Sequence, residues 1–413
     1  MTAGTTVLPR VTAAQRRARL VLRHLLAPRA RKDTAGAVVD ALVGLHATDP
    51  ATVYLSAAAR MHAPTAAAID HSLYHAPDGV PGLERIRCMR RTMFVVPAPL
   101  APAVQSATTR DTHRAQAVAQ LSEAFGWDER RRVLVEQAVL AALAARGGAT
   151  AAQLAVDIPD LREQIVISRG KPYESRQRAG TSVLGLLAAQ GRIRRTRPNG
   201  SWTSAQFRWA PARPLPRIPE AEAKTMLARH YIGAFGPVTA EDMKWWTGWT
   251  VSDTRKAIAA TGAQAVELDE GTGYLLPEDL ASLERLGHFD ASEDNAGPEP
   301  AVALLPSLDP TPMGWRHRDW YLDPDHTKAL FDRNGNIGPT IWWNGRVIGT
   351  WAQHAQGHIN HHLLTDPGRQ ARAAIEAEIQ RLLTFLDGTR VTPCYRTPLE
   401  RGLAGRPRRE VSR

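Results

Sequence analysis

Residues 174–211 read ESRQRAGTSVLGLLAAQGRIRRTRPNGSWTSAQFRWAP. The first half begins with basic residues and becomes apolar, which predicts a helix over 174–191. The second half places two strand-like runs around Asn199-Gly200, a dipeptide typical of tight turns, and predicts a hairpin over 192–211. A helix followed by a basic hairpin is typical of the end of a winged helix-turn-helix. This stretch therefore predicts a winged helix.

The chain on either side repeats this order of elements. Within the same unit, helices are predicted over 128–148 and after Thr150, which can cap the second one. Before the unit, the pattern predicts helices over 13–27, over 34–46, from Pro50 and over 65–75. A strand or hairpin is predicted over 83–97. After the unit, the pattern predicts helices over 222–236, from Thr239 and over 251–262. A hairpin that turns at Gly271-Thr272-Gly273 is predicted over 263–277.

The last third of the chain differs in composition. Residues 281–300 are acidic and contain proline and glycine, which is typical of a linker. The chain beyond them is rich in strand-forming residues and ends in an amphipathic helix over 369–386. We therefore expect an α+β protein with these segments: an N-terminal winged-helix-like unit (1–125), a second winged helix with a basic wing (126–215), a third winged helix (216–280), the linker (281–300), a β-rich module with a C-terminal helix (301–400) and a basic tail (401–413).

Charge points to the kind of partner. The 413 residues include 52 Lys and Arg against 41 Asp and Glu, a net charge of +11. A basic protein favours a polyanion, nucleic acid first, although a GC-rich genome also raises arginine content. The sequence shows no apolar run long enough to span a bilayer and no secretory signal. Cys88 and Cys394 belong to no CxxC pair and fit a reduced cytoplasmic protein, although two cysteines can pair. We expect no metal and no cofactor.

Several segments together resemble the AlkZ/YcaQ-like family of winged-helix DNA glycosylases. They occur in the family's order and are LVGLHATDPATVYLSAAAR (42–60), RRTMFVVP (90–97), FGPVTAEDMKWWTG (235–248), LLPSLDPTPMGWRHRD (304–319), NGRVIGTWA (344–352) and RVTPCYRTPLERGL (390–403). The resemblance implies three tandem winged helices joined to a β-barrel-like module around a DNA-binding cleft. It also implies hydrolysis of the N-glycosidic bond of alkylated purines, including bulky adducts and interstrand crosslinks.

The departure from the family lies in GLHATDP, residues 44–50. The family's catalytic motif is Gln-x-Gln or Gln-x-Asp in a GLQAQDP-like context. Here His46 stands at the first Gln and Thr48 at the second, and Asp49 follows. The resemblance therefore places His46, Thr48 and Asp49 at the catalytic position while their chemistry differs.

These three side chains suit hydrolysis of a glycosidic bond. A neutral imidazole at His46 can orient water near C1′ or accept its proton. The Thr48 hydroxyl can bond that water or a sugar oxygen, and Asp49 can supply negative charge beside an oxocarbenium-like transition state. A structural interpretation is equally open. Asp49 before Pro50 is a helix N-cap in its own right, and a histidine near a helix C-terminus is favoured by the helix dipole.

Arginine clusters are the predicted contacts to DNA. Arg90 and Arg91 lie on the ribbon after the candidate catalytic segment, and Arg176 and Arg178 begin the predicted recognition helix. The wing carries the densest cluster, which consists of Arg192, Arg194, Arg195 and Arg197 beside Trp202. Guanidinium groups suit phosphates. The alternative is an arginine-rich hairpin that is merely solvated.

Other candidates indicate less chemistry. Trp245, Trp246 and Trp249 lie on a helical turn and are expected in the core or an interface. The histidines within 358–362 have a strand-like context that does not favour a metal site. Asp309 in LLPSLDP is expected to form a turn.

The sequence thus predicts a bacterial, cytoplasmic, nucleoid-associated protein that binds damaged double-stranded DNA. The first function is a monofunctional glycosylase for purines alkylated at N7 or N3. The alternative is a non-catalytic winged-helix protein, either a transcription regulator or a damage sensor, and a third possibility is hydrolysis of another N-glycoside. We expect no membrane association, and no obligate protein partner is evident.

Overall fold

The computed structural model describes residues 8–75, 81–109, 111–167, 170, 174–286 and 300–405. Helices and small antiparallel sheets are mixed along the chain, so the α+β class is confirmed at that level. No helix of the described residues is both long enough and apolar enough to cross a membrane.

The N-terminal part combines helices with a three-stranded sheet. Four of its described helices begin after a Thr or Asp whose side chain accepts a backbone N–H: α1 (Ala13–Arg23), α2 (Ala35–Ala41), α3 (Pro50–Ala58) and α4 (Ala66–Tyr74). Two 3-10 turns and a further helix complete it: η1 (Pro28–Ala30), η3 (Met89–Arg91) and α5 (Ala101–Thr108). The antiparallel sheet has the order β1-β3-β2 and consists of β1 (Leu45–His46), β2 (Leu83–Arg87) and β3 (Met93–Pro97).

Helix α2 is shorter than predicted, and this changes the setting of His46. The sequence predicted a helix over 34–46, but α2 ends at Ala41, and Val43 adopts a positive φ of 63°. A residue in the left-handed region cannot continue the helix and redirects the chain. His46 therefore lies on strand β1 and not near a helix C-terminus.

The next part of the chain has a hydrophobic core of its own. Its helices are α6 (Asp111–Phe125), α7 (Glu129–Arg146), α8 (Ala151–Asp157), η4 (Pro159–Arg162) and α9 (Ala179–Ala189). Its sheet has the order β4-β8-β7 and consists of β4 (Ala149–Thr150), β7 (Ile193–Arg195) and β8 (Arg208–Pro211). The predicted hairpin is confirmed, but its strands are short and residues 196–207 form a long loop rather than a tight turn.

The helix predicted over 174–191 begins later than expected. Residues 175–178 form β6 (Ser175–Arg178), which pairs with β5 (Gln164–Ile167), and α9 starts only at Ala179. Arg176 and Arg178 therefore lie on a strand, because the apolar periodicity that packs α9 into the core begins after them. The prediction that they begin a recognition helix was wrong.

The third part repeats this architecture. It contains α10 (Glu220–Phe235), α11 (Ala240–Thr247), α12 (Val251–Ala260) and α13 (Pro277–Leu286), with a sheet of β9 (Val238–Thr239), β10 (Gln264–Leu268) and β11 (Gly271–Leu275). The hairpin turns at residues 269–270, because Gly271 already pairs with Leu268. Residues 281–286 of the predicted linker belong to α13, and residues 287–299 lie outside the described residues.

The C-terminal part is an open sheet flanked by helices. The strands β12 (Val302–Leu305), β13 (Thr340–Trp343), β14 (Arg346–Gln353) and β15 (Ile359–Leu363) are antiparallel in the order β12-β13-β14-β15. The helical elements are η5 (Pro324–His326), α14 (Thr327–Leu330), α15 (Gly368–Leu386) and α16 (Pro398–Leu403). Because β12 and β15 are the two edges of this sheet, its described strands close no barrel. Residues 401–403 of the predicted tail end α16, and residues 406–413 lie outside the described residues.

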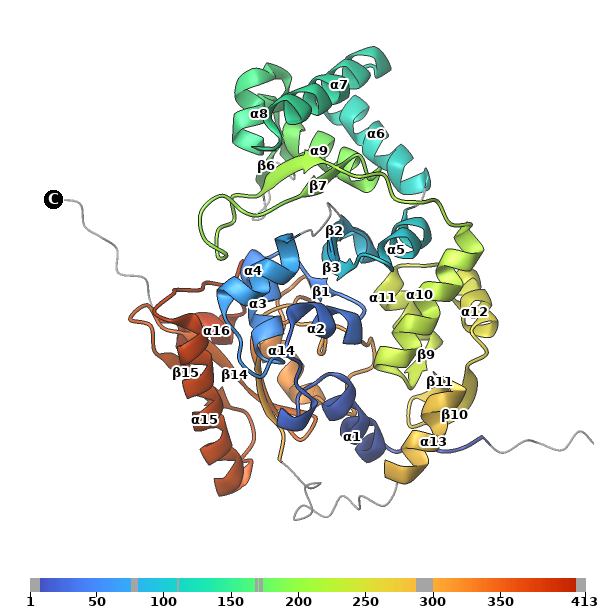
Figure 1. Cartoon of the computed structure of the whole chain (residues 1–413), viewed down its shortest axis with the longest axis vertical. Coiled ribbons are helices and arrows are strands. Elements are labelled where there is room, and N and C mark those ends of the chain that lie inside the picture. The colour runs from blue at the N-terminus through green and yellow to red at the C-terminus, as the bar shows by residue number, and fades with distance from the viewer. Residues whose placement is uncertain are drawn as a thin grey trace, which may run out of the picture.

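When the 3-10 turns and the β5–β6 hairpin are set aside, one order of elements occurs three times in the described chain. This order is helix, strand, two helices and two strands. The three copies are α2-β1-α3-α4-β2-β3, α7-β4-α8-α9-β7-β8 and α10-β9-α11-α12-β10-β11. In each copy the first strand pairs with the last one. Figure 1 shows the second copy as a lobe above the rest of the molecule, with α10 to α13 on one side and α15 on the other.

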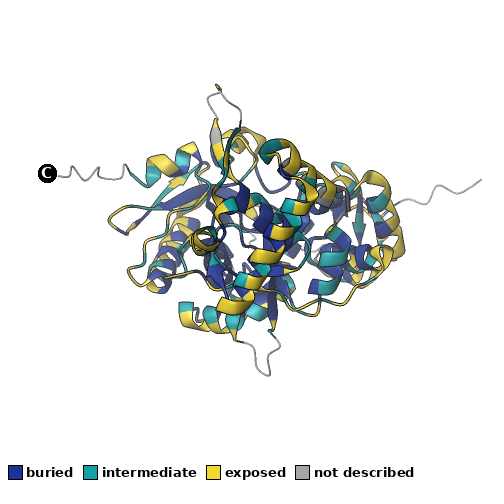
Figure 2. Ribbon diagram, turned by 90° about the horizontal axis from the view of Figure 1, so that it is seen from above, coloured by how far each residue is buried: buried dark blue, intermediate teal, exposed yellow. Residues whose placement is uncertain are grey.

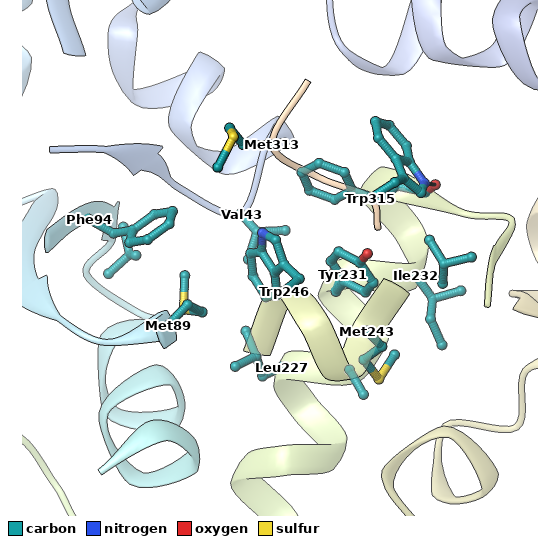
Figure 3. Packing of buried hydrophobic residues seen from close by; sticks show 14 of the residues in the cluster. Val43, Met89, Phe94, Leu227, Tyr231, Ile232, Met243, Trp246, Met313 and Trp315 are labelled. Atoms are coloured by element: carbon teal, nitrogen blue, oxygen red, sulfur yellow. Dashed lines mark hydrogen bonds between the residues drawn. The ribbon is translucent and has the colours of Figure 1, made fainter. Parts of the chain in front are cut away.

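The main core joins the N-terminal part to the third part. Figure 3 shows Met89 and Phe94 on one side and Trp246 and Tyr231 of the third part on the other. Figure 2 shows buried residues through the centre and exposed residues on the outer sides of the surrounding helices. Packing of the first sheet into this shared core positions the segment that follows β1.

Candidate active site and nucleic-acid interface

His46 lies in the interior at the end of β1. It is 5% exposed, and its ring packs edge-to-face on Phe94 of the paired strand at 5.1 Å between ring centroids. Its Nδ1 is buried without a hydrogen-bond partner among the described residues. Burial, and to a lesser extent the positive charge of Arg90, lowers the pKa of His46 to about 3. The imidazole is therefore neutral at physiological pH.

Thr48 has the same property two positions further on. Its Oγ1 is buried and finds no hydrogen-bond partner in the part of the chain that the structure describes. Burying a polar atom without a partner is unfavourable, so such an atom is a candidate contact for a water or a substrate. His46 and Thr48 thus place two buried polar atoms without hydrogen-bond partners in one short segment.

Asp49 is tied into the fold by both carboxylate oxygens. Oδ1 accepts the N–H of Ala51 at 3.1 Å, which confirms the N-cap of α3, and Oδ2 accepts the N–H of Cys394 at 2.8 Å. Burial raises the pKa of Asp49, and the two N–H donors partly oppose this shift. Among the described residues, no hydrogen bond or ion pair joins Asp49 to His46, so the two side chains are neighbours in sequence with different surroundings.

Asp49 faces a small cavity between α3 and the C-terminal sheet. Its lining includes polar groups from both sides, and the residues are Asp49, Ala51, Thr52, Leu55, Pro306, Ser307, Pro339, Trp351, Ala352, Gln353, Val391, Pro393 and Glu400. His46 is not among them. The carboxylate therefore lines a space that the imidazole does not reach.

A buried ion pair fixes α3 to the C-terminal part. Arg60 and Asp309 are both fully buried and joined by hydrogen bonds of 2.6 and 2.8 Å. Ser56 donates to the same carboxylate at 2.7 Å, and Thr311 accepts from Arg60 at 2.8 Å. Asp309 was predicted only as a turn former, because nothing in sequence spacing links it to Arg60. This network holds the helix that Asp49 caps.

Arg90 and Arg91 lie between β2 and β3 in η3, both with positive φ. The Arg90 guanidinium stacks on Trp245 at 4.1 Å, and Arg318 approaches the same ring at 4.9 Å. Burial and then Arg318 lower the pKa of Arg90 to about 10. Arg91 is exposed. Arg90 lies near His46, since its charge contributes to the pKa shift of that imidazole.

The wing arginines separate into two kinds. Arg194 is only 8% exposed and is held by Gln105 at 2.9 Å and by Glu84 at 3.6 Å. Arg192 and Arg197 are 45% and 66% exposed in their side chains, and both lie beside a carboxylate, Glu136 and Asp70 respectively. Arg195 is partly buried against aromatic rings. The exposed strand β6 also carries Arg176 and Arg178.

Trp202 packs within the molecule rather than projecting from it. Its ring stacks on Tyr54 at 5.1 Å and lies 5.7 Å from Phe385. The loop that carries Trp202 therefore reaches from the second copy of the repeat across α3 to α15. Sequence reasoning placed Trp202 beside the arginines, and only the fold shows which rings it meets.

The described residues form no candidate metal centre. Within the described residues, no three His, Cys, Asp or Glu side chains are close enough together to hold an ion. Cys88 and Cys394 are both free thiols.

Comparisons with known proteins bear on the fold and the family of this chain. A family model described as DNA glycosylase AlkZ-like matches residues 39–385. The interstrand DNA cross-link repair glycosylase of Streptomyces sahachiroi is 28% identical over 142 residues, and this match spans 33% of this chain but only 36% of that relative's length. The solved structure of Streptomyces sahachiroi DNA glycosylase AlkZ has a TM-score of 0.68 at 21% identity, covering 92% of this chain and 98% of that chain. At that identity the structural likeness shows the fold alone.

Proposed function

Since the chain belongs to the AlkZ-like DNA glycosylase family, we propose that it hydrolyses the N-glycosidic bond of purines alkylated at N7 or N3 in double-stranded DNA. Bulky adducts and interstrand crosslinks are further substrates of this proposal, since the curated relative is named for crosslink repair. The observation that carries it is the pair of unsatisfied buried polar atoms, His46 Nδ1 and Thr48 Oγ1, on the segment that matches the family's catalytic position.

In the proposed mechanism His46 orients water rather than deprotonating it. A base with a pKa near 3 takes a proton from water weakly, whereas a neutral imidazole nitrogen accepts a hydrogen bond well. Thr48 shares that water or bonds a sugar oxygen. Asp49 lines a separate cavity, so it supplies negative charge toward the oxocarbenium-like transition state through space and not through the water that His46 holds. The N7-alkylated base already carries positive charge, so departure of the base needs little further help.

We also propose that the three repeated units are tandem winged helices. The order helix, strand, two helices, hairpin and the pairing of the first strand with the last support this. The expected unit boundaries follow from the same repeat. Damaged DNA would contact the arginines of the second wing and of η3, in the cytoplasm and beside the nucleoid.

The deciding experiment is excision from a defined duplex. The full-length protein is incubated with a duplex that contains one N7-methylguanine, a second that contains a bulky N7 adduct, and an undamaged duplex. Alkali then cleaves any abasic site, and we expect strand breaks only at the lesions. Binding to damaged duplex without any break would contradict the glycosylase and favour the non-catalytic damage sensor.

A further inference from the structure

Arg85 on β2 is a buried cation without a partner. It is 7% exposed, and its Nη1 and Nη2 are buried with no hydrogen bond or ion pair to any described residue. Its guanidinium lies 5.8 Å from the ring of Tyr74, whose hydroxyl is likewise buried without a partner. A buried unpaired guanidinium is unfavourable in the free protein. Such a group is expected where an anion binds.

Arg195 on β7 adds a second cation to the same place. Its Nε and Nη1 are buried without hydrogen-bond partners in the described part of the chain, and its guanidinium stacks on Phe207 at 3.9 Å. Burial, followed by the positive charges of Arg85 and Arg87, lowers the pKa of Arg195 to about 10. The ion pair between Arg194 of β7 and Glu84 of β2 places the two strands side by side, and Arg195 and Arg85 are the next residues along them. The two guanidinium groups therefore repel each other at this junction.

The described carboxylates nearby already have other cations. Glu84 lies within 4 Å of Arg194 and Arg213, and Asp70 bonds Tyr54 and Arg197. These acids are engaged, so neither neutralises the pair.

We propose that Arg85 and Arg195, with the Tyr74 hydroxyl, bind one phosphate of the DNA backbone at the junction of β2 and β7, on the face of the first sheet opposite His46. Arg85 pairs with Val95, which also pairs with Leu45, the residue before His46. Guanidinium groups present planar pairs of N–H donors that match the two non-bridging oxygens of a phosphodiester. The inference rests on the proposed DNA substrate and adds a positioning contact on the face of the sheet opposite His46.

The test measures binding of damaged duplex by Arg85→Met, Arg195→Met and the double variant over a range of salt. Each single variant should bind roughly tenfold more weakly. Each should also lower the slope of log K against log salt by about 0.9. The double variant should change the slope by about one unit and not two, because both arginines contact one phosphate. Arg372→Met, an exposed arginine on α15 beside Asp366, is the matched control and should leave affinity unchanged.

Thermal unfolding separates a binding role from a structural one. Arg85→Met removes an unpaired buried charge, so its Tm should stay equal or rise. A lower Tm with an unchanged salt slope would make Arg85 structural and overturn the phosphate site. If the wild type bound no damaged duplex, both proposals would fail. If it bound and excised while Arg85→Met and Arg195→Met kept full affinity, only the phosphate site would fail.

Discussion

At the residue scale, the segment from His46 to Asp49 combines two kinds of group. Asp49 satisfies both oxygens within the fold, while His46 Nδ1 and Thr48 Oγ1 are left without partners among the described residues. An internally satisfied carboxylate is what a helix cap requires, and unsatisfied buried atoms are what a bound water or substrate requires. The segment is therefore both a connection between elements and the best candidate for chemistry.

Replacement of His46 should separate orientation of water from proton abstraction. His46→Ala should slow single-turnover excision by roughly 10²-fold, within the range of a lost positioned catalytic group. His46→Gln restores a side chain that can bond water without titrating, so it should retain most of the rate. Binding of undamaged duplex is the control and should not change. Equal rates for His46→Ala and wild type would remove His46 from the mechanism.

Asp49→Asn should lower stability as well as excision. An asparagine can keep the cap on α3, but its amide would place a donor against the N–H of Cys394, which costs about 1–2 kcal/mol. The loss of the negative charge should also slow excision at least tenfold beyond any loss of rate that the lower stability of the variant causes. Thr65→Ala removes the cap of α4, costs about 1 kcal/mol and should leave excision intact, so it serves as the stability control. If Asp49→Asn behaves like Thr65→Ala, Asp49 is only a cap.

At the element scale, the wing packs against other parts of the molecule as much as it projects from them. Trp202 packs between Tyr54 and Phe385, and Arg194 turns inward to Gln105 and Glu84. The order of charges along a hairpin does not reveal which of its side chains are buried, because burial depends on the neighbouring element that the hairpin covers. Among the wing arginines, Arg192 and Arg197 keep exposed side chains, whereas Arg194 is already engaged inside the molecule.

The wing arginines should therefore differ in their effect on DNA binding. Arg192→Ala combined with Arg197→Ala should lower the slope of log K against log salt by about one to two units. Arg194→Ala should lower the stability by about 1–3 kcal/mol, because it leaves buried groups unpaired, with little change in the slope. Fluorescence anisotropy at several salt concentrations and thermal unfolding measure the two effects. A slope that changes only in Arg194→Ala would reverse this assignment.

At the scale of the whole molecule, buried histidines connect the parts. His24 of the N-terminal part bonds Thr311 of the C-terminal part at 2.9 Å and stacks on Trp315. Burial, and then the charge of Arg60, lowers its pKa to about 3, as burial does for His46. Both rings are neutral in the folded protein and would be protonated below about pH 6.5 in the unfolded chain.

Stability should therefore fall as the pH is lowered from about 6.5 toward 3. In this window the unfolded chain binds more protons than the folded protein, so acid favours unfolding. His46→Gln removes one of the two protons, and its Tm should decline less between pH 7 and pH 4.5 than that of the wild type. Differential scanning fluorimetry in buffers of equal ionic strength measures both curves. A steeper decline in His46→Gln would contradict a neutral, buried His46.

Local signals in the sequence determined much of this protein. The caps at Thr12, Thr34, Asp49, Thr65 and Thr239 mark where helices begin, because capping depends on residues within a few positions of one another. The hairpins and the α+β class follow from alternation and turn residues in the same way. The family's segments were also readable, since they keep their order along the chain.

Tertiary structure decided what depends on distant neighbours. The early end of α2 made His46 a strand residue, because pairing with β3 outweighed the helical pattern. The ion pair between Arg60 and Asp309 spans residues that no spacing rule connects. The unpaired state of Arg85 and Arg195 follows from the docking of β7 beside β2, where burial removes water without supplying a described carboxylate partner. Burial and electrostatics are sums over the whole fold, so the sequence alone does not determine them.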